Sequence, residues 1–137
     1  MLTLIAGLKG SGKTKLLVER ANQAVDTTKG CVVVIEQGPK LMHEIKYQAR
    51  LVDTDEYGVC GADALYGLLV GTYASNHDVT HIFVDSALKI CGGDMKAFGS
   101  FMTKTGVLAA KHNIQIFVTA SCEGGTLPDE AKKYLVY

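Results

Sequence analysis

Residues 2–14 read LTLIAGLKGSGKT and predict how the chain begins to fold. Leu2 to Ala6 is a short apolar run that stops at a glycine, as a buried parallel strand does. The next eight residues, Gly7-Leu8-Lys9-Gly10-Ser11-Gly12-Lys13-Thr14, fit the pattern G-x-x-x-x-G-K-S/T at every fixed position. From Lys13 to about Asp26, apolar residues recur at helical spacing. The stretch therefore predicts a strand, a glycine-rich loop and a helix.

The glycine-rich stretch has the composition of a phosphate-binding loop. Glycines let the backbone wrap with its N–H groups turned inward, and the following helix directs its positive end at the same point. Lys13 would reach the β- and γ-phosphates of a nucleotide, by default ATP, and Thr14 would offer its hydroxyl to Mg²⁺. The expected nucleotide-binding residues are Gly7, Leu8, Lys9, Gly10, Ser11, Gly12, Lys13, Thr14 and Lys15.

A second motif, His81-Ile82-Phe83-Val84-Asp85, ends an apolar run with an acid. A buried strand that delivers an aspartate to its carboxyl end supplies what Mg²⁺ needs opposite Thr14. The alternative is an aspartate that merely caps the next segment. Asp53 is a rival metal ligand, although only two apolar residues precede it. We expect Thr14 and Asp85 to be the metal ligands.

The remaining chain alternates short apolar runs with helical patterns. Strands are expected at 31–35, 49–52, 80–84 and 114–120, and helices at 62–75, from Asp94 to Asn113, and from Pro128 onward. Residues 40–48 fit neither pattern. Gly67 and Gly71, four apart, are either a close-packing face or two tolerated glycines. The order predicts one α/β domain over 1–137 with a mostly parallel five-stranded sheet flanked by helices.

Composition excludes several classes of protein. The apolar fraction is 47% and the charged fraction 20%, which is typical of a globular domain. Lys and Arg number 14, as do Asp and Glu, so net charge gives no reason to expect nucleic-acid or membrane binding. No apolar run is long enough to cross a bilayer. The four cysteines form no C-x-x-C pair, so reduced thiols in a cytoplasmic protein are expected.

These motifs resemble the P-loop NTPase superfamily, and among its branches the RecA-like proteins and the thymidine kinases. The resemblance implies that the strand after the aspartate strand lies between it and the glycine-loop strand. It also implies that Thr119 or Ser121, at the end of that strand, senses the γ-phosphate. Over its whole length the chain is similar to a group of short bacterial ATP-binding proteins, some labelled twitching-motility (PilT-type) ATPases. Pilus-retraction ATPases have a further N-terminal domain and longer motif blocks.

The chain departs from these families at the catalytic base. They usually place a glutamate directly after the aspartate, where this chain has Ser86, and serine is no base unaided. Glu36 follows an apolar strand at the face where ligands of such sheets bind, so it is the first substitute, ahead of Glu56 and Glu123. The lasso segment of thymidine kinases and the guanine-selecting N-K-x-D motif are absent from the sequence.

The expected function is a regulatory or assembly module that binds ATP with Mg²⁺, hydrolyses it slowly or not at all, and acts on an unknown protein partner. One alternative is an ATPase completed by a neighbouring subunit, for which Arg20 and Arg50 are the only arginines. Others are a small-molecule kinase using the acidic loop 53–56 and a structural protein. The apolar residues 134–137 would cover the edge of the first strand or pair with a second chain, and we predict a homodimer.

Overall fold

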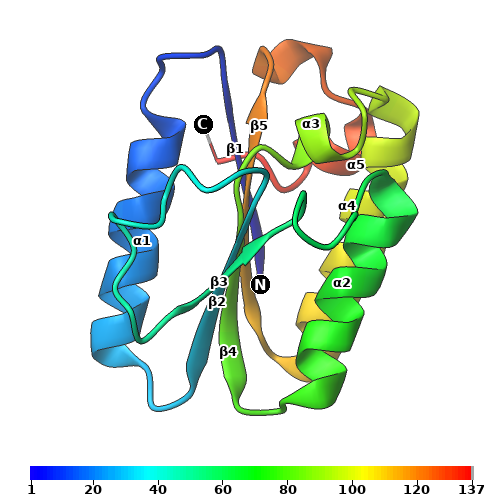
Figure 1. Cartoon of the computed structure of the whole chain (residues 1–137). Coiled ribbons are helices and arrows are strands. Elements are labelled where there is room, and N and C mark those ends of the chain that lie inside the picture. The colour runs from blue at the N-terminus through cyan, green and yellow to red at the C-terminus, as the bar shows by residue number, and fades with distance from the viewer. Residues whose placement is uncertain (137) are drawn as a thin grey trace.

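The computed structural model describes residues 1–136, in which strands and helices alternate along the chain (Figure 1). The strands are β1 (Leu2–Gly7), β2 (Cys31–Glu36), β3 (Arg50–Asp53), β4 (Val79–Val84) and β5 (Gln115–Ser121). The helices are α1 (Lys13–Thr27), α2 (Ala62–Ser75), α3 (Ala87–Ile90), α4 (Met95–His112) and α5 (Asp129–Lys132), with a 3-10 turn over Gly124–Thr126. The predicted strands and long helices are confirmed, whereas α3 and the 3-10 turn were not expected.

All five strands belong to one parallel sheet in the order β1-β5-β4-β2-β3. The last strand, β5, therefore lies between β1 and β4, as the resemblance implied. Parallel pairing brings the carboxyl ends of all the strands to one end of the sheet, which is where ligands of such sheets bind. The glycine-rich stretch after β1 and Asp85 after β4 both lie at this end.

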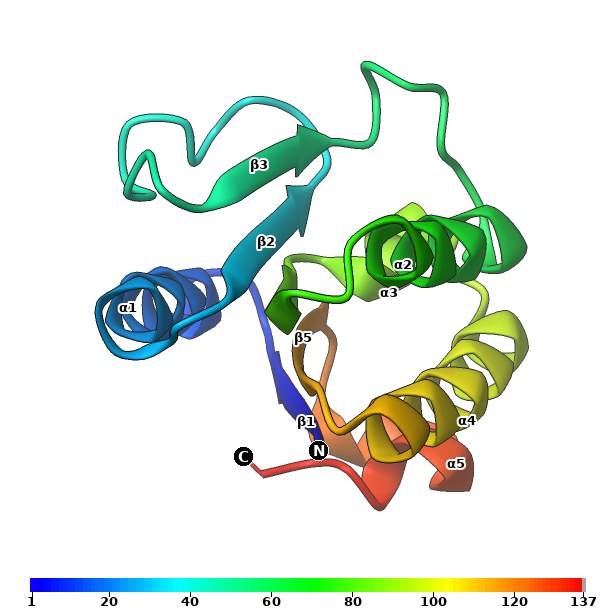
Figure 2. The same cartoon turned by 90° about the horizontal axis from the view of Figure 1, so that it is seen from below.

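Helices cover the two faces of the sheet unequally (Figure 2). Helices α2 and α4 lie on one face, where they build the larger apolar core with residues such as Leu65, Phe98 and Phe101. Helix α1 lies on the other face and buries Leu17 and Ala21 in a smaller core. None of the helices over residues 1–136 is long and apolar enough to cross a membrane.

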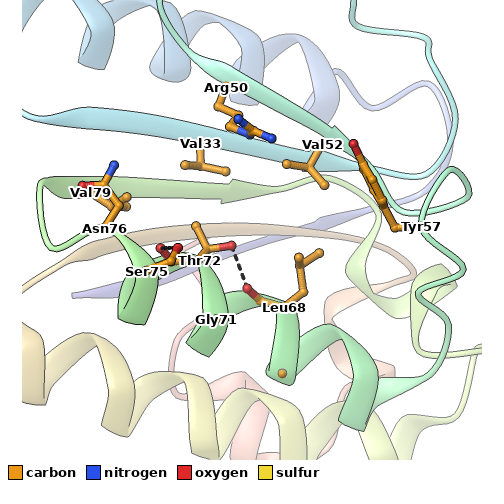
Figure 3. Close-up of a pocket in the computed structure, with 11 residues that line it drawn as sticks. Val33, Arg50, Val52, Tyr57, Leu68, Gly71, Thr72, Ser75, Asn76 and Val79 are labelled. Atoms are coloured by element: carbon orange, nitrogen blue, oxygen red, sulfur yellow. Dashed lines mark hydrogen bonds between the residues drawn. The ribbon is translucent and has the colours of Figure 1, made fainter.

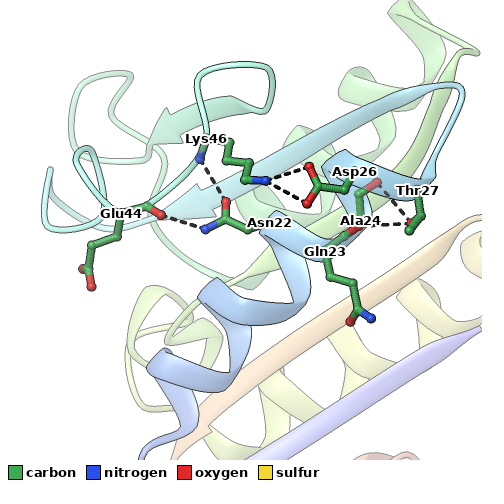
Figure 4. Close-up of polar contacts among 7 residues, drawn as sticks. All are labelled: Asn22, Gln23, Ala24, Asp26, Thr27, Glu44 and Lys46. Carbon is green, nitrogen blue, oxygen red and sulfur yellow. Dashed lines mark hydrogen bonds and ion pairs between the residues drawn. The ribbon is translucent and has the colours of Figure 1, made fainter.

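The crossover between β2 and β3, where residues 40–48 fit no helix or strand pattern, is a series of turns held against α1 (Figure 4). Asn22 of α1 bridges it twice: its Nδ2 donates to the Glu44 carbonyl at 2.8 Å, and its Oδ1 accepts from the Lys46 N–H at 2.9 Å. The Lys46 ammonium also pairs with Asp26 at 2.6 Å. Tertiary contacts, rather than local periodicity, therefore fix this segment.

The outer edge of β1 is closed by the chain itself. The Leu4 N–H donates to the Tyr134 carbonyl, and the Val136 N–H donates to the Leu4 carbonyl, both at 2.9 Å. Residues 134–137 were expected either to cover the edge of the first strand or to pair with a second chain. Residues 134–136 cover the edge of β1 in their own chain, and Tyr137 lies outside the described residues. An unpaired edge is then left at β3, on the other side of the sheet.

Candidate functional site

Residues 7–14, here called the glycine loop, join β1 to α1 in a conformation that requires glycine. Gly10 and Gly12 have φ of 88° and 87°, which side chains other than hydrogen rarely permit. Gly12 is the N-cap of α1, so no side chain caps the helix, and its first turn contains no acidic residue. The positive end of a 15-residue helix thus faces the loop without a negative partner from its own first turn.

The loop is tightly folded on itself and open to solvent. A Cβ at Gly7 would collide with the Ser11 hydroxyl, and the Ser11 N–H donates to the Leu8 carbonyl at 3.1 Å. Leu8, Lys9 and the residues up to Gly12 are nevertheless exposed. A compact, solvent-exposed backbone turn suits the approach of a large anion.

Lys13 is folded back into the glycine loop. Its side chain is only 7% exposed, and its ammonium lies 3.5 Å from the Leu8 carbonyl oxygen. A long, single contact of this kind satisfies a buried ammonium poorly, because the group has three donors. The lysine is therefore available to an anion placed in the loop.

Thr14 and Asp85 meet directly. The Thr14 hydroxyl lies 3.2 Å from Oδ1 and 3.3 Å from Oδ2 of Asp85, although 71 residues separate them in the sequence. Two adjacent oxygen ligands of an octahedral Mg²⁺ stand about 2.9 Å apart, given metal–oxygen distances near 2.0–2.1 Å. The pair thus fits neighbouring corners of such a site with a shift of a few tenths of an ångström.

Thr119 on β5 holds Asp85 from the other side. Its hydroxyl is fully buried, donates to Asp85 Oδ1 at 2.7 Å and accepts from the Ser86 N–H at 2.8 Å. Ser86 has a left-handed backbone, with φ of 57°. The Thr119 hydroxyl thus fixes both Asp85, by donating, and the turn after it, by accepting. This arrangement could not be predicted from local patterns, because it depends on the pairing of β4 with β5.

Four polar side chains form a row across four adjacent strands: Thr119, Asp85, Glu36 and Asp53. In the strand register, Glu36 pairs with Asp53. The residues that directly precede Glu36, Asp85 and Thr119 also pair with one another across the sheet: Ile35 with Val84, and Val84 with Val118. Since side chains alternate along a strand, these four point to the same face as Val34, Phe83 and Phe117, which is the face that α1 covers. We call this set the polar row.

Glu36 is the most deeply buried acid of the polar row, at 2% exposure. Its Oε2 accepts the Leu41 N–H at 3.0 Å. Burial raises the pKa of the Glu36 carboxyl above its usual value, and the negative charges of Asp85 and Asp53 raise it further, whereas the Leu41 hydrogen bond opposes the shift. Glu36 is thus placed beside the aspartate, at the strand end that the sequence predicted.

The acidic loop after β3 is a pinned turn. Asp53 Oδ1 accepts from the Gly38 N–H at 2.7 Å and from the Asp55 N–H at 2.9 Å. Asp55 and Glu56 are exposed, while the Thr54 hydroxyl is buried with no hydrogen-bond partner in the described structure. Asp53 therefore organises the ends of β2 and β3, and its first carboxylate oxygen is already occupied.

The other predicted residues differ in how close they lie to this centre. Ser121 is exposed at the end of β5 and pairs with Gly7, the first residue of the glycine loop. Lys15 is exposed on the first turn of α1. Glu123 and Arg20 are exposed, and neither forms a hydrogen bond or ion pair with the polar row within residues 1–136. Arg20 lies toward the amino ends of the strands, where it lines a hollow with Met1 and Gln115.

No protein-family model matches this chain, and no curated protein sequence matches it. Among the described residues, no three His, Cys, Asp or Glu side chains are gathered as a self-sufficient metal site. Mg²⁺ rarely has one: it is usually bound through one or two carboxylates, with water and substrate phosphates completing the shell. Thr14 and Asp85 together suit that mode of binding.

Proposed function

We propose that this chain is a P-loop protein that binds ATP with Mg²⁺ and changes its partner or its oligomeric state with the bound nucleotide. The observation that carries the proposal is the pair Thr14 and Asp85, whose oxygens lie 3.2 Å apart directly behind the glycine loop. The sequence pattern of the loop supports phosphate binding, and this pair supports a cation beside the phosphates.

Each residue of the site has a role in this proposal. The amides of the glycine loop and the start of α1 receive phosphate oxygens. Lys13 leaves the Leu8 carbonyl and pairs with the phosphates, while Thr14 and Asp85 hold the metal. Bound Mg²⁺ neutralises negative charge on the β- and γ-phosphates. Thr119 keeps Asp85 oriented through the 2.7 Å hydrogen bond.

The state of Glu36 favours slow hydrolysis. A general base must reach the proton that it removes, within about 2.6–3.2 Å or through one water. Glu36 is 2% exposed, and its Oε2 is engaged by the Leu41 N–H. It would have to give up that bond and turn outward to serve a water molecule. The resting chain therefore holds its nucleotide without an active base.

Thermal unfolding with ATP, ADP, GTP and dTTP, each with and without Mg²⁺, tests the proposal. A ligand at 100 times its Kd adds about 2.7 kcal/mol to the free energy of unfolding. For 137 residues that is a rise of about 9 °C in the melting temperature. We expect the full shift only with ATP and Mg²⁺, its loss in Lys13→Ala, and its retention in the exposed control Lys29→Ala. No shift with any nucleotide would refute the proposal.

A second candidate function is an ATPase completed by a neighbouring subunit. The place of Glu36 in the polar row beside Asp85 favours it, because a loop movement at Leu41 would release this carboxylate. A rate of phosphate release per molecule of protein that rises with protein concentration, and that disappears in Glu36→Gln, would support this function. Turnover that is unchanged in Glu36→Gln would exclude Glu36 as the base.

A further inference from the structure

A hollow of about 450 Å³ lies between α1 and the sheet at the amino ends of the strands. Its lining residues come from α1, β4, β5 and the start of the chain up to β1, and we call it the amino-end hollow. Figure 1 shows the last turn of α1 and the start of β4 at the end of the sheet opposite the glycine loop. Small-molecule sites are typically concavities of about 300–1,000 Å³ that combine apolar walls with a few polar groups.

Helix α1 lines the amino-end hollow with a polar stripe. Arg20, Gln23 and Thr27 follow one another at intervals of three and four residues, so they share one side of the helix. Ala24, on the same side, is buried and contributes only a methyl group. The helix thus presents hydrogen-bonding side chains to the hollow and leaves space between them.

The sheet also contributes polar side chains at this place. Parallel strands covered on both faces normally read as nearly continuous apolar runs. Thr3, His81 and Gln115 interrupt those runs, and all three line the amino-end hollow. His81 and Gln115 pair in register on the neighbouring strands β4 and β5. Polar groups from three strands therefore gather beside the polar stripe of α1.

Aromatic rings form the floor of the amino-end hollow. Phe83 and Phe117 line it, are buried, and have ring centroids 5.7 Å apart. The His81 ring lies nearly parallel to that of Phe83, with an interplanar angle of 4° and centroids 6.2 Å apart. Aromatic rings pack favourably against a further ring at separations of this order. The floor therefore suits a flat aromatic group.

The charge of the amino-end hollow is positive. Arg20 is the only charged side chain among its described lining residues, and it forms no ion pair within residues 1–136. Burial lowers the pKa of His81, so this ring adds no full charge at neutral pH. A guanidinium pairs with a carboxylate through two parallel hydrogen bonds. The last turn of α1, the negative end of the helix dipole, lies close by and disfavours an anion of higher charge.

We propose that the amino-end hollow binds a small aromatic carboxylate, with its carboxylate on Arg20 and its ring against Phe83 and Phe117. Gln23 and Gln115 line the same hollow and can form hydrogen bonds with a hydroxyl or amino substituent on the ring. The site lies at the opposite end of the sheet from the glycine loop, so the proposal does not depend on nucleotide binding.

A second concavity provides a comparison, because it contains the other arginine of the chain. This groove of about 560 Å³ lies between α2 and the β2–β3 side of the sheet (Figure 3). Arg50 lines it, but Val33 and Val52 form its floor, where the amino-end hollow has two phenylalanine rings. Replacing Arg50 is therefore the matched control for replacing Arg20.

Isothermal titration calorimetry with 4-hydroxybenzoate tests the proposal. We expect saturable binding by the wild type, with a dissociation constant that rises about tenfold or more in Arg20→Ala and for the neutral probe 4-hydroxybenzamide. Cyclohexanecarboxylate, which keeps the charge without the aromatic ring, should bind about threefold or more weakly. Arg20→Lys should fall between wild type and Arg20→Ala, because lysine keeps the charge but not the planar fork.

Two controls locate the bound probe. Arg50→Ala and Lys13→Ala should bind 4-hydroxybenzoate as the wild type does, which separates the amino-end hollow from the groove and from the glycine loop. Melting temperatures check the fold of each variant. No saturable binding at millimolar probe would overturn the proposal, as would equal affinity for the neutral amide or unchanged affinity in Arg20→Ala. Loss of binding in either control would also overturn it, since the probe would then lie elsewhere.

Discussion

Replacing Thr119 by valine removes one hydroxyl and keeps the shape of a fully buried side chain. Two hydrogen bonds are lost: the one to Asp85 Oδ1 at 2.7 Å and the one from the Ser86 N–H at 2.8 Å. The first is charge-assisted and the second leaves a partly buried backbone donor without an acceptor. We therefore expect Thr119→Val both to destabilise the fold and to weaken the Mg²⁺-dependent part of nucleotide binding.

The magnitude follows from these two bonds. A hydrogen bond to a charged group contributes about 1.5–3 kcal/mol, and an unsatisfied buried donor costs about 1–3 kcal/mol. Because both involve one hydroxyl, a total loss of about 2–4 kcal/mol is expected. At about 2.1 cal/mol/K of unfolding entropy per residue, 137 residues convert this loss into about 7–14 °C of melting temperature.

Thermal unfolding by circular dichroism measures the effect, and Thr105→Val is its matched control. Thr105 is also fully buried, but its hydroxyl has no hydrogen-bond partner in the described structure. The same substitution there removes an uncompensated polar group, so the melting temperature should stay constant or rise. Thr119→Ser, which keeps a hydroxyl, should recover part of the loss. If both valine variants melted within 2 °C of each other, the role assigned to Thr119 would be refuted.

Three further outcomes are expected. Glu36→Gln should raise the melting temperature at neutral and higher pH and have less effect in acid. The pKa of the Glu36 carboxyl is raised in the folded protein, so the wild type loses stability as the pH rises through that pKa. An equal shift in melting temperature at every pH would contradict this cause. The exposed Cys60 should react with a thiol reagent at pH 8 well before Cys91. Burial, and to a lesser extent the negative charge of Asp94, raise the pKa of the Cys91 thiol to about 11. Equal reaction rates would contradict the burial of Cys91. Deleting residues 134–137 should lower the melting temperature and promote further self-association, because it removes both backbone bonds to Leu4 and opens the β1 edge. Light scattering that stays at the wild-type value would contradict an exposed edge.

Local sequence signals predicted the regular elements well. Helix α2 spans Ala62–Ser75 as expected. Asp94 caps α4 by accepting from the N–H groups of Lys96 and Ala97, and Asn113 ends it with a left-handed backbone. Each of these signals acts within a turn or two of the chain, so no tertiary information is needed to see it.

Features that depend on contacts between distant residues were not predictable in this way. The β2–β3 crossover is shaped by Asn22 of α1, which lies 22 residues before Glu44 in the chain. Helix α3 has only four residues, too few to show a helical period. The sequence placed Glu36, Asp85 and Thr119 at strand ends, but their alignment into the polar row needed the strand order and the register.

The residue after Asp85 has a tightly fixed backbone. Ser86 is left-handed, its N–H is tied to Thr119, and its carbonyl accepts from the Ile90 N–H at 3.2 Å as α3 begins. The backbone of Ser86 is thus fixed at three points. Glu36 lies one strand away from Asp85 in the parallel sheet, on the face that α1 covers. The carboxylate nearest in sequence order is thus replaced by one that lies beside Asp85 across the sheet, and its Oε2 accepts from the Leu41 N–H.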